Sequence, residues 1–452
     1  MPTDVAKAMT HLALNLARCA DTLKITTTQR VVDEEEGLLH SIDQTLSAEQ
    51  LTRLAQCNLK TPLLDCIKVQ AQITQGDLYK ELVRQVTHSA DLQQLISTTF
   101  TLDQLQSLTV VAAKLPRVLE WLSILRAAFP EHFQQALFCA AMAAVLSHHM
   151  GQNKAFQQGA FVAGLCHDLG IVCLTQETVD NKTEPEYWTV YQQHPLLAQP
   201  FLERIPKLPG LIIRAIAESH ERCDGSGYPH QKSAKQLSQL GQILAMSDLL
   251  WGLLTVRLWP QGMTLAHARH ILHISADAHF RNTYEALVKA LKAAKLKSEL
   301  STPQDQIPAL VEHSLLSVDQ LNQCYMSLYA MVTALPRERP SRIMAACYHS
   351  LAAIHRAVNS AGVLTSEHYQ WLQELQQGAV STAMGEELES AALFHVALRW
   401  ELSRLLDNLK YIYHSERTLL KADVVNLLSI GLQGIKDSQQ DRPETQIGLL
   451  FW

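Results

Sequence analysis

The stretch FVAGLCHDLG, residues 161–170, decides the fold of this chain. Its small side chains favour close packing of a helix over 156–169 against a neighbouring helix. His167 and Asp168 fall at the C-terminal end of this predicted helix, and Gly170 is typical of a helix terminus. A neutral imidazole next to a carboxylate offers two ligands for a hard or borderline divalent metal. The stretch therefore predicts a helix that ends at a metal site.

Further ligand-type side chains follow at intervals of about one helix-turn-helix unit. The predicted helices and their ligands are 187–204 with His194, 209–220 with His220 and 238–256 with Asp248. A buried, unpaired carboxylate costs several kcal/mol, so Asp248 in an apolar helix needs a hydrogen-bond partner or a metal. Each of these residues alone fits a structural role. Together with His167 and Asp168, in this order, they indicate one pocket between antiparallel helices.

Composition limits the class of protein. The 452 residues are 47% hydrophobic and 18% charged, which is enough for two or three domains with apolar cores. A net charge of -6 without any polybasic run excludes a nucleic-acid polymer as a general partner. No window reaches the roughly 18 to 20 apolar residues of a membrane span. Nine dispersed cysteines without a CxxC pair, and an N-terminus unlike a secretion signal, predict a soluble cytoplasmic protein.

Helical periodicity recurs along almost the whole chain, and β-branched runs with strict alternation are nearly absent. The expected fold is therefore all-α. Composition shifts predict three regions, which are an N-terminal helical region over 1–100, a metal-binding domain over 101–300 and a C-terminal helical domain over 309–436. A polar stretch over 297–308 is expected to link the last two. The flanking regions carry no catalytic signature, so core packing or dimerisation is their default role, with binding of a signalling partner as the alternative.

Four separate motifs resemble the HD-GYP branch of the HD phosphohydrolase superfamily, in the family's order and at nearly its spacing. They are HDLG at 167–170, YQQHP at 191–195, SHERCDGSGYP at 219–229 and ILAMSDLLWGL at 243–253. The resemblance covers roughly residues 115–300 and implies an HD-domain helical bundle that binds divalent metal. Family members hydrolyse cyclic di-GMP, and the loop that corresponds to Gly227, Tyr228 and Pro229 lies near their substrate.

The resemblance also implies a set of site residues. The expected metal ligands are His167, Asp168, His194, His220 and Asp248, with Glu131 as an added carboxylate. Asp168 is the expected catalytic residue, because a carboxylate that bridges two cations helps them lower the pKa of a shared water. We expect one or two ions at this site, and the family favours iron or manganese.

Three positions depart from the family pattern. Gln135 stands where the preceding helix usually supplies a histidine, and His132 is the candidate replacement for that imidazole. Ile171 replaces a lysine that contacts the substrate phosphate, and Ser219 replaces one of two neighbouring histidines. Loss of a ligand or of its support commonly costs about ten- to a hundredfold in metal affinity or activity. The departures therefore predict weak catalysis.

These observations predict a bacterial-type signalling protein with a divergent HD-GYP domain. We expect this domain to bind metal together with a cyclic dinucleotide or a partner protein, with weak or no phosphodiesterase activity. One alternative is an active metal-dependent phosphodiesterase that uses Glu131 and solvent in place of the lost ligands. A second alternative is a metal-free helical interaction protein. A homodimer is compatible with all three.

Overall fold

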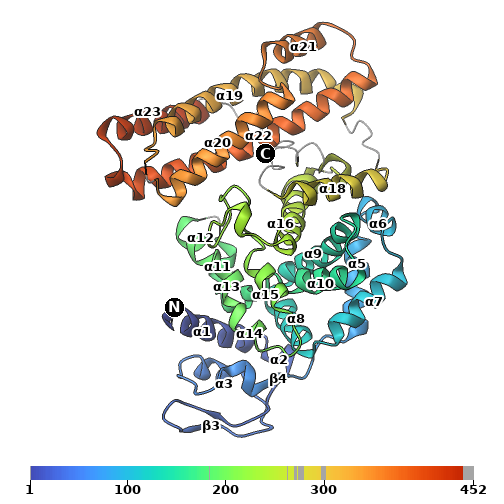
Figure 1. Ribbon diagram of the computed structural model, residues 1–452, viewed down its shortest axis with the longest axis vertical. Helices are drawn as coiled ribbons and strands as arrows, with labels where there is room; N and C mark the ends of the chain where they lie inside the picture. Colours follow the sequence, from blue (N-terminus) through green and yellow to red (C-terminus); the bar gives the residue numbers. More distant parts are fainter. Residues whose placement is uncertain are drawn as a thin grey trace. The chain divides into compact units, whose positions relative to one another are not determined.

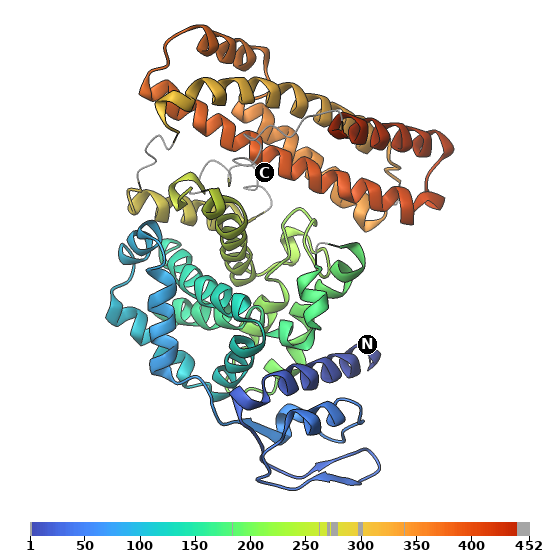
Figure 2. The same ribbon diagram turned by 180° about the vertical axis from the view of Figure 1, so that it is seen from behind.

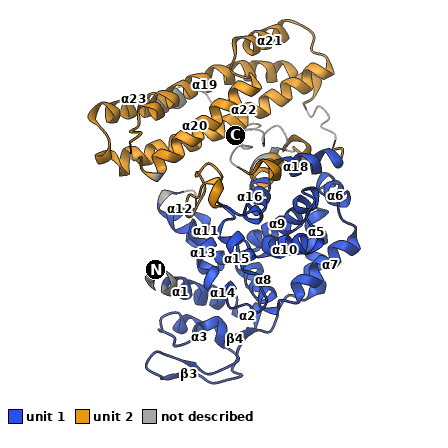
Figure 3. Ribbon diagram, viewed as in Figure 1, with its two compact units in different colours: residues 1–221, 237–251, 285–294 blue, residues 222–236, 252–284, 295–452 orange. Residues whose placement is uncertain are grey.

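The computed structural model divides the chain into two compact units, which are described separately (Figure 3). The described residues are 2–182, 184–261, 263–268, 272, 279–296, 302–338 and 340–440. The first unit comprises residues 1–221, 237–251 and 285–294, and the second comprises 222–236, 252–284 and 295–452. Helices dominate both units and only short strands accompany them in the described residues (Figure 1). The predicted all-α fold is confirmed.

Two helices form the core of the first unit. They are α9 (Pro130–His149) and α10 (Lys154–Cys166), which pack against each other (Figure 1). All residues from 136 to 147 of α9 are buried, so this helix is apolar on every side, as a central helix must be. Asn153 caps α10, because its side-chain oxygen accepts a hydrogen bond of 2.9 Å from the backbone N–H of Phe156.

The contact between α9 and α10 requires a glycine. A Cβ atom built on Gly164 would lie 2.5 Å from the Cα of Ala140 and 2.6 Å from its backbone nitrogen. The two backbones therefore touch, and neither can yield by a side-chain rotation. This contact sets the distance between the helix that carries Gln135 and the helix that leads to His167 and Asp168.

Substitution of Gly164 by alanine will separate the two helices. We expect Gly164→Ala to lower the free energy of unfolding by about 1–3 kcal/mol, the usual cost of overpacking. Gly159→Ala on the same helix is the control, because no atom lies within 4 Å of its added Cβ. The control will stabilise the protein by about 0.5–1 kcal/mol through helix propensity. Denaturant titration of both variants measures the difference, and equal stabilities would contradict the tight contact.

Shorter helices surround this core. They are α5 (Gln75–Val86), α6 (Ala90–Ser97), α7 (Leu102–Ala113), α8 (Pro116–Ala128), α11 (Gln176–Asp180), α15 (Gly210–Ala217), α16 (Gln239–Gly252) and α18 (Arg281–Ala293). Helices α5 and α8 pack against α9, and α15 packs against α10. The residues that follow α10 and α15 come close together, since the rings of His167 and His220 lie 6.2 Å apart.

The single helix predicted over 187–204 is wrong. The structure has three short helices there, which are α12 (Pro185–Tyr191), α13 (His194–Leu197) and α14 (Gln199–Leu202). Pro195 and Pro200 each occupy the second position of a short helix, where the missing N–H is harmless. Inside one long helix both rings would clash with the preceding turn. As a result His194 begins a helix.

The N-terminal residues belong to the same compact unit as the predicted metal-binding region, and the three-region division of the chain stays a prediction. Their elements are α1 (Pro2–Arg18), α2 (Ala20–Leu23), β1 (Ile25–Thr27), β2 (Val31–Val32), β3 (Leu38–His40), α3 (Ala48–Leu54), α4 (Leu63–Cys66) and β4 (Ile67–Val69). The two short sheets pair β1 with β4 and β2 with β3, both antiparallel. Buried Asn15 of α1 donates hydrogen bonds of 2.9 and 2.8 Å to the carbonyls of Val172 and Leu174. These bonds attach α1 to the turn that follows the His167-Asp168 pair.

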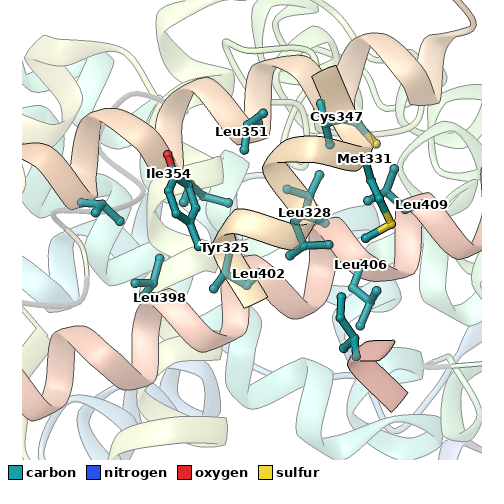
Figure 4. Close-up of a cluster of buried hydrophobic side chains, with 14 of the residues drawn as sticks. Tyr325, Leu328, Met331, Cys347, Leu351, Ile354, Leu398, Leu402, Leu406 and Leu409 are labelled. Atoms are coloured by element: carbon teal, nitrogen blue, oxygen red, sulfur yellow. The ribbon is translucent and has the colours of Figure 1, made fainter. Parts of the chain in front are cut away.

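The second unit contains a bundle of long helices. They are α19 (Ile307–Ala334), α20 (Arg342–Ala361), α21 (Ser366–Gln377), α22 (Thr382–Ser415) and α23 (Ala422–Gln440). The yellow α19 and the orange α22 run side by side in both views (Figures 1 and 2). Figure 4 shows the apolar core between α19, α20 and α22, in which Leu328, Leu351 and Leu402 are among the buried side chains. None of the described helices combines the length and apolar character that a membrane crossing needs.

A buried histidine makes the stability of this bundle depend on pH. His395 on α22 is 3% exposed, and burial lowers its pKa to about 3, assisted by the neighbouring charges of His368, Arg399 and His313. The ring of His368 lies 5.6 Å from that of His395. An unfolded histidine titrates near 6.5. The unfolded chain therefore binds a proton that the folded chain excludes, so this contribution to stability is complete above pH 6.5 and is lost toward pH 3.

We expect His395→Gln to remove this acid sensitivity. Between pH 6.5 and 3 the wild type should lose up to about 5 kcal/mol more stability than the variant. Thermal unfolding midpoints across that range measure the difference. His414→Gln is the control, since His414 is exposed on the same helix and should leave the pH dependence unchanged. Parallel curves for wild type and His395→Gln would show that His395 does not titrate in this way.

Candidate metal centre

The five predicted histidine and aspartate ligands meet inside the first unit. They are His167 and Asp168 after α10, His194 at the start of α13, His220 after α15 and Asp248 on α16. The side chains of His167, Asp168 and His194 are fully buried, while 21% of the Asp248 side chain is exposed. The centre is therefore a buried cluster of ligand-type side chains that reaches solvent at Asp248.

Three imidazoles surround one oxygen of Asp168. Its Oδ1 lies 3.3 Å from Nε2 of His167, 3.2 Å from Nε2 of His194 and 3.4 Å from Nε2 of His220. The other ring nitrogen of His220, Nδ1, lies 3.1 Å from Oδ2 of Asp248. His220 thus bridges the two carboxylates.

Backbone carbonyls determine which nitrogen of two histidines faces the centre. Nδ1 of His167 donates to the carbonyl of Gly164 at 2.8 Å, and Nδ1 of His194 donates to the carbonyl of Tyr191 at 2.9 Å. A carbonyl oxygen only accepts, so the proton of each neutral ring sits on Nδ1. Each Nε2 then presents a lone pair toward Asp168, which is the arrangement of a metal-binding histidine.

Two buried atoms of the centre have no hydrogen-bond partner among the described residues. They are Nε2 of His167 and Oδ2 of Asp168. A buried polar atom without a partner costs about 1–3 kcal/mol, so such atoms are rare unless they serve a ligand. An imidazole nitrogen and a carboxylate oxygen are common ligands of divalent metals. The residues present therefore fit a metal ion.

The candidate ligands fall into two groups, each with its ligand atoms within 4.8 Å of one another. One group is Asp168 with His194 and His220, and the other is Cys139 with His167 and Asp248. Two groups are compatible with the prediction of one or two ions. The chemical identity of those ions stays a prediction.

The charged groups of the centre shift one another's pKa values. Burial alone would raise the pKa of Asp168, but His167, His194 and His220 outweigh burial and hold this pKa well below its usual range. Burial also opposes the charge on His220, yet Asp248 and Asp168 raise the pKa of that imidazole to about 9. At neutral pH the centre thus contains ionised carboxylates beside the imidazolium of His220. A divalent cation would replace that positive charge.

Cys139 is a candidate ligand that the sequence analysis missed. It is fully buried on α9, and its Sγ belongs to the group with His167 and Asp248. In the sequence, the dispersed cysteines indicated only a reducing compartment. The available signal was spacing, because Cys139 follows Gln135 by four residues and so lies on the same face of the helix.

The three departures from the family pattern provide no metal ligand. Nε2 of Gln135 donates a hydrogen bond of 2.6 Å to Oδ1 of Asp248. Ile171 is fully buried in η1 (Leu169–Cys173). Ser219 is also buried, and its hydroxyl donates to the carbonyl of Ile216 at 2.8 Å. Gln135 therefore holds a carboxylate in place, whereas Ile171 and Ser219 are turned into the protein.

The remaining residues predicted on α9 lie in neither ligand group. Glu131 is exposed in the first turn of the helix, so its role as a ligand stays a prediction. His132 is buried, and its Nε2 lies 3.4 Å from the hydroxyl of Tyr191. Burial lowers the pKa of His132 to about 4, so this ring is neutral at physiological pH.

The glycine of the HDLG motif allows His194 to approach. A Cβ atom on Gly170 would overlap with the carbonyl oxygen of His194 and lie 2.8 Å from its carbonyl carbon. The backbone at the start of α13 therefore lies directly against the turn after Asp168. Any larger residue at position 170 would displace His194 from the centre.

The predicted substrate loop belongs to the second unit. Gly225 has a φ of +78°, and Oδ1 of Asp224 accepts hydrogen bonds from the N–H and the hydroxyl of Ser226 at 3.0 and 2.6 Å. These bonds stiffen the loop before Gly227, Tyr228 and Pro229. The substrate-binding role of those last three residues stays a prediction.

Residues 108–283 match the family of HD domains. The chain carries an HD domain. All five predicted histidine and aspartate ligands lie within the matched residues, and so does Cys139. The resemblance that the four motifs indicated is confirmed.

The chain is similar to phosphodiesterases that are named for cyclic dinucleotides. A cyclic di-GMP phosphodiesterase of Pseudomonas aeruginosa is 24% identical over 216 residues, which are 47% of this chain and 52% of that protein. A 3'3'-cGAMP-specific phosphodiesterase of Vibrio cholerae is 25% identical over 143 residues, or 31% of this chain and 33% of that protein. A cyclic di-GMP phosphodiesterase of the same organism is 27% identical over 139 residues, or 29% and 28%. The chain spans about half the length of the first relative and about a third or less of the other two. The low identities fit a divergent member of the HD-domain family.

Binding of metal to this HD domain will stabilise the fold. We expect Mn²⁺, or Fe²⁺ without oxygen, to add about 2.7 kcal/mol to the free energy of unfolding at a concentration a hundred times the dissociation constant. Asp168→Asn should abolish this gain in stability, because Oδ1 of Asp168 lies next to all three imidazoles of the centre. Asp180→Asn, at an exposed position, is the control. Thermal unfolding with and without metal tests this, and a gain that survives Asp168→Asn would locate the ion elsewhere.

Proposed function

We propose that this chain is a signalling protein whose HD domain binds a divalent metal and a cyclic dinucleotide, with weak or no hydrolysis. The convergence of three Nε2 atoms on the buried carboxylate of Asp168 is the observation that carries the proposal. The similarity to phosphodiesterases of cyclic di-GMP and 3'3'-cGAMP supports the class of ligand. The nine free cysteines favour a reducing compartment, and we place the protein in the cytoplasm.

The chain's own side chains would hold one or two metal ions, with iron or manganese favoured by the resemblance. The proposed ligands are His167, Asp168, His194, His220 and Asp248. A bound divalent ion would supply positive charge to phosphate oxygens and would activate water. The carbonyls of Gly164 and Tyr191 keep the rings of His167 and His194 in the correct tautomer and orientation.

Three features support weak turnover. The amide of Gln135 occupies Oδ1 of Asp248, where the resemblance implies a histidine ligand nearby. Ile171 presents no charge to a phosphate because its side chain is apolar and fully buried. Ser219 directs its hydroxyl to a backbone carbonyl. Each change removes a donor or a cation from the site, at a cost of about ten- to a hundredfold.

An active phosphodiesterase is the second candidate. It is favoured by the group of Asp168, His194 and His220, which keeps a carboxylate and two imidazoles together. In this case Glu131 and solvent would take the place of the lost ligands. Binding of a partner protein or formation of a homodimer is compatible with both candidates, since exposed apolar side chains such as Leu316, Met326 and Ile430 lie on the long C-terminal helices.

Binding and turnover of nucleotide can be measured separately on the full chain. With Mn²⁺ or anaerobic Fe²⁺, we expect calorimetry to detect binding of cyclic di-GMP or 3'3'-cGAMP, and chromatography to show hydrolysis at least about a hundredfold slower than by the Pseudomonas relative. Asp168→Asn should weaken binding about tenfold or more, whereas Asp180→Asn should not.

The outcomes distinguish the candidates. Rapid hydrolysis that Asp168→Asn abolishes would overturn the weakly active protein in favour of the enzyme. If neither cyclic di-GMP nor 3'3'-cGAMP binds, the proposed class of ligand is overturned. Gln135→His should increase hydrolysis if the missing imidazole limits the rate, and an unchanged rate would remove that explanation.

A further inference from the structure

The buried thiol of Cys139 faces the metal centre from α9. Its Sγ lies within 4.8 Å of ligand atoms of His167 and Asp248. Gln135, one turn earlier on the same helix face, does not serve as a metal ligand, because its amide donates a hydrogen bond to Asp248. Bonds of about 2.0–2.3 Å to a tetrahedral ion place ligand atoms roughly 3.3–3.8 Å apart. The group therefore needs only a small contraction to hold an ion.

A second observation indicates a ligand at this position. Nε2 of His167 is buried and has no hydrogen-bond partner among the described residues. Nδ1 of the same ring donates its proton to the carbonyl of Gly164. This Nε2 lies 3.9 Å from Oδ1 of Asp248, a distance that an ion bound to both atoms would span. This nitrogen, which also lies 3.3 Å from Oδ1 of Asp168, is thus within reach of an ion held by Cys139 and Asp248.

We infer that Cys139 is a thiolate ligand of a metal subsite formed with His167 and Asp248, where it replaces the imidazole absent at Gln135. The inference rests on the proposed function only in requiring a metal in this HD domain, and nucleotide binding is not needed for it. Coordination forms a sulfur–metal bond, and the thiol proton leaves to solvent. The resulting donor set has one sulfur, one nitrogen and one oxygen atom.

A sulfur donor changes the metal preference of the subsite. Thiolates favour borderline ions such as Fe²⁺, Co²⁺ and Zn²⁺, whereas Mn²⁺ prefers oxygen ligands. The subsite therefore prefers Fe²⁺ to Mn²⁺. Its donor set also suits Zn²⁺ and Co²⁺. The second group, Asp168 with His194 and His220, contains no sulfur and keeps its tolerance for manganese.

Cobalt provides a direct readout of a thiolate ligand. The full chain, stripped of metal by chelation, is titrated with Co²⁺ and monitored for the near-ultraviolet sulfur-to-cobalt charge-transfer band. We expect the band in the wild type and its loss in Cys139→Ser, with Co²⁺ affinity of this subsite reduced about tenfold or more and Mn²⁺ affinity changed less than about threefold. Cys166→Ser is the matched control, since Cys166 is equally buried beside His167 but lies in neither ligand group.

Each result has a defined meaning. Cobalt binding without the band, or a band that persists in Cys139→Ser, overturns the inference and leaves the proposed function intact. Absence of any metal binding overturns the inference together with the metal-binding part of the proposed function. If Cys139→Ser fails to fold, X-ray absorption of the zinc-loaded wild type and Cys166→Ser decides, because a sulfur shell at roughly 2.3 Å in both supports the inference and its absence in the wild type overturns it.

Discussion

The buried charge of Asp168 is the constraint on which the centre depends. A carboxylate without solvent exposure is tolerated only when nearby groups compensate its charge. The three imidazoles that do so come from the end of α10, the start of α13 and the residues after α15. These elements must therefore begin or end at one point. The prolines that divide residues 185–202 into short helices serve this purpose, because they let His194 stand at a helix start.

The helical fold and the order of the ligands could be predicted from the sequence, because both depend on local patterns. Apolar periodicity identifies helices, and the histidine and aspartate residues that interrupt it identify the candidate metal ligands. Two features were not accessible in this way. The pairing of Ile25–Thr27 with Ile67–Val69 joins segments about forty residues apart, which no local pattern encodes. The four-residue spacing places Cys139 on the same helix face as Gln135, but only the tertiary packing shows that this face lies at the centre.

Two positions on one face of α9 would share the role that the resemblance assigns to a single histidine. Gln135 donates a hydrogen bond to Asp248, and the Sγ of Cys139 lies within 4.8 Å of a ligand atom of the same carboxylate. Residues four apart on a helix face the same partner, so a donor can move by one turn without a change in the backbone. On the proposed role of Cys139, the ligand chemistry of the centre differs from the family pattern while its helices keep their arrangement.

The backbone contact at Gly164 has a consequence for how the centre tolerates substitution. Main-chain atoms of Gly164 and Ala140 bring the two central helices together inside an apolar core. This packing does not depend on the side chain at position 135, which is only partly buried. An exchange there leaves the helix contact in place, whereas loss of an imidazole beside Asp168 leaves a buried charge uncompensated. The scaffold therefore tolerates change at the edge of the centre more readily than change next to Asp168.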